Sequence, residues 1–171
     1  MTTITAMTAY ERAKVDKAER ARVSEAARVD RQRAETERTE NVKRRLAGPA
    51  ARLEQQLQLE SAAILRDGGK PTIEGPIYRG ERLYVALSFT LNTTPEDVRR
   101  NVIYKFTVDV HADQNSAYAA AQPVGALTSG SAGSGETRWS LGAPDSPEFE
   151  ANVQRALETF MMHVVDPGHA G

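Results

Sequence analysis

Three residues with metal-ligand chemistry alternate near the middle of the chain. Asp109, His111 and Asp113 stand two residues apart at the end of an alternating apolar stretch. If this stretch is a β-strand, every second side chain lies on one face, and the two carboxylates and the imidazole lie side by side. Such a set could bind a divalent metal ion and support an enzyme that acts on a small molecule. The competing interpretation is an ordinary solvent-facing strand surface, because Lys105 and Thr107 continue the same row.

Other catalytic signatures are absent from the sequence. The chain has no cysteine, which excludes disulfides, cysteine-rich zinc sites and thiol catalysis. No serine stands in a Gly-x-Ser-x-Gly elbow, and the Gly69–Lys70 pair lacks the remainder of a phosphate-binding loop. His163 is expected to be a partly buried structural residue. We therefore expect no catalytic residue, no resident metal and no cofactor, with the metal-dependent or small-molecule enzyme kept as an alternative.

The row that holds Asp109 and His111 belongs to a predicted antiparallel sheet. Residues 82–91 and 102–111 both alternate between apolar and polar side chains, which is typical of strands with one buried face. Residues 72–78 are expected to form an edge strand, because Gly75–Pro76 interrupts them, and residues 136–141 a short strand. The expected inward side chains of the two clear strands are Leu83, Val85, Leu87, Phe89 and Leu91, and Val102, Tyr104, Phe106, Val108 and Val110.

Two amphipathic helices are expected to cover one face of this sheet. The first ends at Asp67–Gly69, a strong stop signal, and the last begins at Ser146–Glu148. Their predicted buried stripes are Leu46, Ala50, Leu53, Leu57 and Ile64, and Phe149, Val153, Leu157, Phe160 and Val164.

These elements predict an α+β domain over residues 48–171. The expected order is helix–β–β–short helix–β–β–helix, with three to four mainly antiparallel strands and a short helix over 94–101. Residues 112–135 contain a Ser- and Gly-rich run and are predicted as a flexible loop, within which 116–122 could form a helical turn or a returning strand. Residues 167–171 are expected to be a disordered tail.

Residues 1–47 are predicted to form a charged helical arm. No Pro or Gly occurs from Thr8 to Ala47, and Ala, Arg, Glu and Lys dominate. From Glu11 to Arg45 twelve basic and eight acidic residues give a net charge of +4, whereas the remainder of the chain carries −5. Gly48–Pro49 is expected to kink or break the helix, with Pro49 in the first turn of the next one, and so to separate arm from domain.

One face of the arm carries a thin apolar stripe, which we call the arm seam: Val15, Ala18, Arg22, Ala26 and Val29. Its spacing is closer to an 11-residue than to a 7-residue period. A helix with so little apolar surface gains little stability alone, so we expect the seam to pack on a second copy or another protein as a coiled coil or oligomer.

Two alternatives to a protein-binding arm stay open. The arm could be a solvated helix, or disordered when alone. It could also be a basic nucleic-acid-binding arm, although its interspersed acids would repel phosphates and no aromatic residue follows Tyr10 within it.

The chain resembles the TolA and TonB periplasmic proteins in one respect. An Ala-rich charged helix precedes a small helix–strands–helix domain, and SPEFEANVQRAL (146–157) is similar to the beginning of their closing helix. The resemblance covers only the last third of the chain by sequence. No stretch of this sequence is expected to serve as the N-terminal membrane anchor of those proteins, so the resemblance implies no residue role.

These observations predict a non-enzymatic structural or adaptor protein. We expect it to assemble with itself or with a larger complex, such as a phage particle or a bacterial secretion or conjugation machine, through its N-terminal helix. The first residues lack the features of a signal peptide, and no stretch approaches 18 apolar residues. A soluble cytoplasmic protein or virion component is therefore expected.

Overall fold

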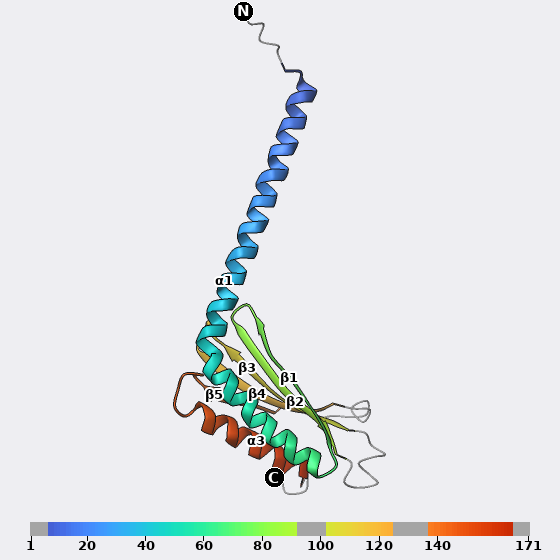
Figure 1. Cartoon of the computed structure of the whole chain (residues 1–171), viewed down its shortest axis with the longest axis vertical. Helices are drawn as coiled ribbons and strands as arrows, with labels where there is room; N and C mark the ends of the chain where they lie inside the picture. Colours follow the sequence, from blue (N-terminus) through green and yellow to red (C-terminus); the bar gives the residue numbers. More distant parts are fainter. Residues whose placement is uncertain (1–6, 92–101, 125–136, 166–171) are drawn as a thin grey trace, which may run out of the picture. The chain divides into compact units, whose positions relative to one another are not determined.

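The computed structural model describes residues 7–91, 102–124 and 137–165 of the 171-residue chain (Figure 1). The chain divides into two compact units, Met1–Arg38 and Thr39–Gly171. The elements follow one another as α1 (Ala9–Arg66), β1 (Lys70–Arg79), β2 (Arg82–Thr90), β3 (Ile103–His111), β4 (Ser116–Val124), β5 (Thr137–Gly142) and α3 (Phe149–Val165).

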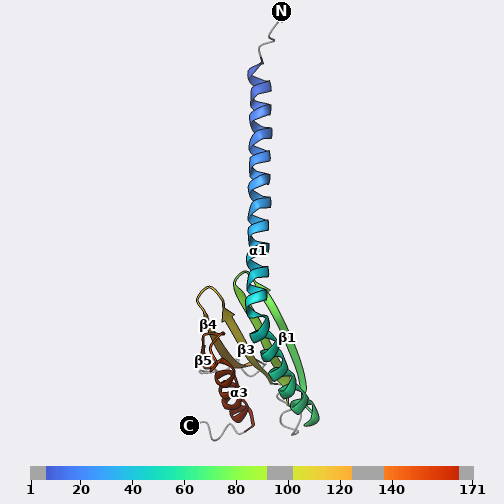
Figure 2. The ribbon, with the colours of Figure 1, turned by 60° about the vertical axis from the view of Figure 1, so that its left-hand side comes forward.

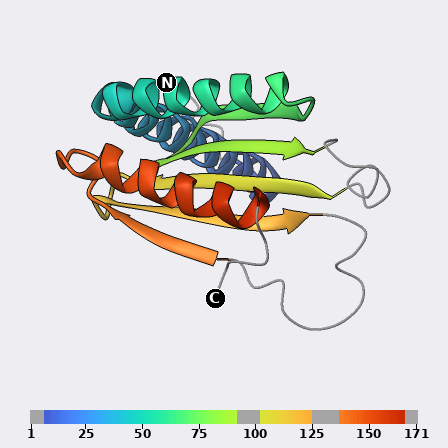
Figure 3. The same cartoon turned by 90° about the horizontal axis from the view of Figure 1, so that it is seen from below.

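The Thr39–Gly171 unit is built on one antiparallel sheet whose strands pair in chain order, β1-β2-β3-β4-β5. The C-terminal part of α1 and α3 lie on the same face of this sheet (Figure 3). The two helix segments also lie side by side (Figures 1 and 2), joined by an Arg52–Glu150 ion pair and a Gln56–Gln154 hydrogen bond. The predicted α+β class and the single helix-covered face are confirmed, with five strands instead of three to four.

The core lies between the two helices and the inward side chains of the sheet. In the register, Leu87 stands opposite Phe106, and Val108 pairs with both Val85 and Ala119, so the large inward side chains of neighbouring strands meet. Both predicted helix stripes are buried, as are the inward residues predicted for the two clear strands, apart from the half-buried Tyr104 of β3 and the half-buried Leu91 and Val102, which lie just outside β2 and β3. The alternation in the sequence therefore identified the core face correctly.

β1 is the edge strand that was predicted, and it is longer than residues 72–78. Its pairing with β2 shifts register between Glu74 and Ile77, where Gly75 has a φ of 101°. A Cβ at Gly75 would lie 2.6 Å from the carbonyl oxygen of Tyr84, so only glycine fits beside β2 here.

The predicted flexible loop over 112–135 is wrong for residues 116–124, which form β4. Ala117, Ala119 and Ala121 are the inward residues of this strand, and all three are buried. Because alanine is small and a poor strand former, the alternation was too weak to identify the strand from sequence. The part of the predicted loop from 125 to 135, the short helix over 94–101 and the tail 167–171 lie outside the described residues.

Of the kink or break predicted at Gly48–Pro49, the break is wrong, because α1 continues from Ala9 to Arg66 with Pro49 inside it. Val42 and Leu46 are already buried in the core of the second unit, which begins at Thr39. Arg45, in the same stretch of α1, donates hydrogen bonds to the Ala112 carbonyl at 3.0 Å and to Asn115 Oδ1 at 2.7 Å, and so ties this part of the helix to the turn after β3.

The predicted end of this helix is confirmed. The N–H groups of Gly68 and Gly69 bond to the carbonyls of Leu65 and Ile64, and Gly68 has a positive φ of 85°.

Candidate protein-interaction surface

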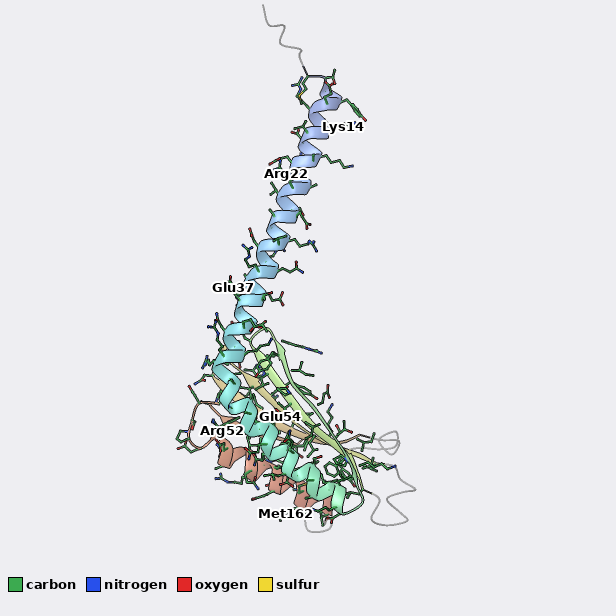
Figure 4. The ribbon with its side chains drawn as sticks, in the orientation of Figure 1. Lys14, Arg22, Glu37, Arg52, Glu54 and Met162 are labelled. Atoms are coloured by element: carbon green, nitrogen blue, oxygen red, sulfur yellow. The ribbon has the colours of Figure 1, made fainter. Side chains whose placement is uncertain are left out.

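The arm seam lies on an exposed part of α1. Every described side chain from Met7 to Arg38 is exposed, and the seam valines Val15 and Val29 keep 55% and 45% of their surface. At about 100° per residue, the five seam residues fall within an arc of about 80° on the helix. Figure 4 shows the side chains of this segment, among them the seam residue Arg22. The seam is therefore a narrow strip of small apolar side chains with one arginine at its centre.

The first turn of the helix is held by a reciprocal cap. The Thr8 backbone N–H donates to Glu11 Oε2 at 2.8 Å, and the Glu11 N–H donates back to Thr8 Oγ1 at 3.3 Å. The bond from the Thr8 N–H, followed by that from its hydroxyl, lowers the pKa of Glu11, because both stabilise the carboxylate. The cap was not predicted, although a Thr three residues before a Glu is its usual signature.

This cap is expected to fail in acid. The pKa of the Glu11 carboxyl is lower in the helix than its usual value of 4.5, so the carboxylate stabilises the helix fully at pH values above 4.5. This stabilisation is lost as the pH falls through the lowered pKa. The amides of Tyr10 to Ala13 should therefore report fraying below that pH in NMR spectra of the full chain. Thr8→Ala removes the donor and acceptor of Oγ1 and should fray the same amides already at neutral pH. Identical titration curves for both proteins would contradict this account of the cap.

Ion pairs on the arm join residues three apart. Arg22 Nη1 lies 3.7 Å from Glu19 Oε2, and Arg28 contacts both Glu25 oxygens, at 2.7 and 3.0 Å. All four side chains are more than half exposed, so water and salt screen these pairs and each stabilises the helix only slightly. Packing of the seam on another surface would bury its apolar side chains and stabilise the helix more than these exposed ion pairs do.

The three candidate metal ligands are not brought together. Asp109 and His111 lie half-buried on the outward face of β3, and the His111 ring meets the Tyr118 ring edge-on at 6.2 Å. Asp113 lies in the turn after β3, where the two-residue alternation no longer applies. Over residues 7–91, 102–124 and 137–165, no group of three or more His, Asp or Glu side chains could hold a metal ion.

The last helix and the uncovered face of the sheet hold two findings that the sequence did not suggest. His163 is exposed and not partly buried, with its ring Nδ1 2.7 Å from the Thr159 carbonyl oxygen. On the uncovered face Lys105 lies over the Tyr84 ring at 5.7 Å, and Arg138 lies over the Tyr118 ring at 4.6 Å. These pairs join neighbouring strands, so they could be found only once the register was known.

No protein-family model, curated protein sequence or solved structure matches the chain. Among the helices in the described part of the chain, none is long and apolar enough to cross a membrane.

Proposed function

We propose that the protein is a non-enzymatic structural or adaptor protein that assembles through its arm seam. The observation that carries this proposal is a long helical segment, from Ala9 to Arg38, whose side chains are all exposed although valines recur along one face. The partner is a second copy of the chain or a protein of a larger complex.

The energetics of the segment favour a partner. Most helices in proteins are stabilised by packing an amphipathic face, and isolated helices are marginal in water. The arm has a cap and local ion pairs, but its seam valines stay about half exposed. Fully burying an exposed valine is worth about 1.5–3 kcal/mol, so completing the burial of four half-exposed seam valines would contribute about 3–6 kcal/mol to a weak, reversible association.

The charge pattern favours a protein over a nucleic acid. Acidic residues interrupt the basic ones throughout the arm, and Glu19 and Glu25 are ion-paired beside the seam. A phosphate backbone would meet these carboxylates. The setting that we propose is an assembly such as a phage particle or a bacterial secretion or conjugation machine, in the cytoplasm or in a virion.

Charge substitutions on the arm test the proposal in the full chain. Val15→Glu/Val29→Glu should abolish association, because burying the seam would then bury two carboxylates. Val23→Glu/Ala27→Glu is the matched control, since it adds the same charge to exposed positions that lie about 100–140° from the centre of the seam. Sedimentation velocity reports self-association, and retention of proteins from an extract of producing cells reports other partners.

The expected result is loss of association in the seam variant and retention in the control. Circular dichroism should show both variants folded. Identical behaviour of seam variant, control and wild type, in sedimentation and in retention, would contradict an arm that assembles through its seam.

A further inference from the structure

The residue types of the arm seam are arranged symmetrically about Arg22. From Arg22, an alanine stands four residues away on either side and a valine seven residues away on either side. The symmetry of spacing continues one step further, to Glu11 and Arg33, which stand eleven residues before and after Arg22 and carry opposite charges. All seven residues are exposed on the helix Ala9–Arg66.

We infer that the partner of the arm seam is the arm of a second copy, lying antiparallel to the first with the two-fold axis at Arg22. This inference rests on the proposed function. In this arrangement residues at equal distances from Arg22 lie opposite one another. Val15 meets Val29 of the second copy, and Ala18 meets Ala26 of the second copy. At both ends Glu11 meets Arg33 of the second copy.

Charge separates this arrangement from the parallel one. A parallel, in-register pair would place Glu11 against Glu11, Arg22 against Arg22 and Arg33 against Arg33, three like-charged contacts along one seam. Like charges in a helix–helix interface select against the orientation that brings them together. In the antiparallel pair the two outer contacts join opposite charges, Glu11 with Arg33 of the second copy. The Glu11 carboxylate can make this contact because both hydrogen bonds that it accepts from Thr8 go to Oε2, which leaves Oε1 for the guanidinium.

The central Arg22 pair is the one like-charged contact that stays. Glu19 and Glu25 lie three residues before and after Arg22, so carboxylates of both copies surround the two guanidinium groups. Glu19 Oε2 already lies 3.7 Å from Arg22 Nη1 within one copy. Glu25 is bonded through both oxygens to Arg28 of its own copy, so the two Glu19 carboxylates are the groups that compensate the repulsion between the two Arg22 side chains.

The side-chain sizes also fit two helices in close contact. Ala18 and Ala26 flank the centre and allow the two backbones to approach, while the valines fill the wider ends. The buried apolar surface is small, so the dimer should form only at elevated concentration. Its antiparallel order is fixed by charge more than by packing.

The absence of cysteine makes the orientation testable in the full-length protein by disulfide exchange in a glutathione buffer. A disulfide needs Cα atoms about 4.4–6.8 Å apart. In the antiparallel pair, thiols at position 15 of two copies stand fourteen residues apart along the axis, or about 21 Å. Val15→Cys alone should therefore not cross-link, whereas a mixture with Val29→Cys chains, distinguished by a size tag, should give the mixed dimer.

We expect the mixed dimer to exceed both homodimers by at least about tenfold, because only the mixed pair meets the disulfide distance. Val23→Cys, which lies off the seam, should give little dimer in any mixture. Dominant Val15→Cys homodimers would overturn the antiparallel orientation and leave assembly through the seam intact. No cross-link in any mixture, with association still abolished by Val15→Glu/Val29→Glu, would mean that another protein occupies the seam. Failure of the proposed function is seen separately, as seam and control charge variants that behave alike.

Discussion

Replacing Phe106 with alanine is expected to lower the free energy of unfolding of the Thr39–Gly171 unit by about 3–5 kcal/mol. Phe106 is fully buried at the middle of β3, the central strand of the sheet. Its ring lies 5.5 Å from that of Phe160 on α3 and 6.2 Å from that of Trp139 on β5. The substitution removes these contacts and leaves a cavity between sheet and helix. Since domains are typically stable by only about 5–15 kcal/mol, the effect should be large.

Trp139 is the only tryptophan of the chain, so its fluorescence during urea unfolding reports on this unit. Thr107→Ala is the matched control, because it changes the next residue of the same strand on the opposite, half-buried face. Its hydroxyl donates to the Ala120 carbonyl at 3.3 Å, and losing this bond should cost about 1 kcal/mol or less. Equal losses in the two variants would mean that Phe106 is not a central core residue.

The large side chains of the core could be predicted from the sequence because their periodicity is physical. Leu83, Val85, Leu87 and Phe89 repeat every two residues, and a strand places such residues on one face. The helix stripes repeat at the helical period for the same reason. The order of these strands and helices along the chain is compatible with few folds other than helices packed on one face of an antiparallel sheet.

Where side chains are small or elements end, the sequence carried less information. The inward residues of β4 are alanines, which differ little in polarity from the half-buried residues between them. The alternation that marks a strand was therefore not visible in the sequence. Asp113 was placed on the same face as Asp109 and His111 although the predicted strand ended at residue 111, so the two-residue alternation was extended beyond the strand. His111 ends β3, and the next residues turn back toward β4.

The exposure of the candidate seam could be predicted from the sequence, but its local contacts could not. The spacing of Val15 and Val29 places both on one helix face, and both residues are exposed. Opposite charges three and four residues apart are equally compatible with a helix, so the sequence could not say which would pair. Glu40 illustrates this, since it pairs with Lys43 at 2.8 Å while Arg44 donates to Asn41 at 2.6 Å.

Pro49 lies inside α1 although proline is strongly disfavoured in the interior of a helix. Proline in a helix interior costs about 3 kcal/mol, because it removes a backbone hydrogen bond and its ring crowds the preceding turn. Leu46, Ala50 and Leu53 on both sides of it are buried in the core. Fully burying one leucine stabilises the fold by about 1.5–3 kcal/mol, so two leucines and an alanine outweigh the cost of one proline. The helix therefore continues through Pro49, where the sequence predicted a kink or a break.

This balance implies that Pro49→Ala should raise the free energy of unfolding by about 1–3 kcal/mol, as the hydrogen bond is regained while the stiffness that proline gives the unfolded chain is lost. Gly48→Ala is the neighbouring control and should raise it by about 1 kcal/mol at most, because its new Cβ would meet only the Arg52 side chain, at 3.4 Å. Urea unfolding followed by Trp139 measures both. A loss of stability in Pro49→Ala would show that the packing of Leu46 and Leu53 depends on the backbone geometry that proline imposes, and the cost assigned to Pro49 would then be wrong.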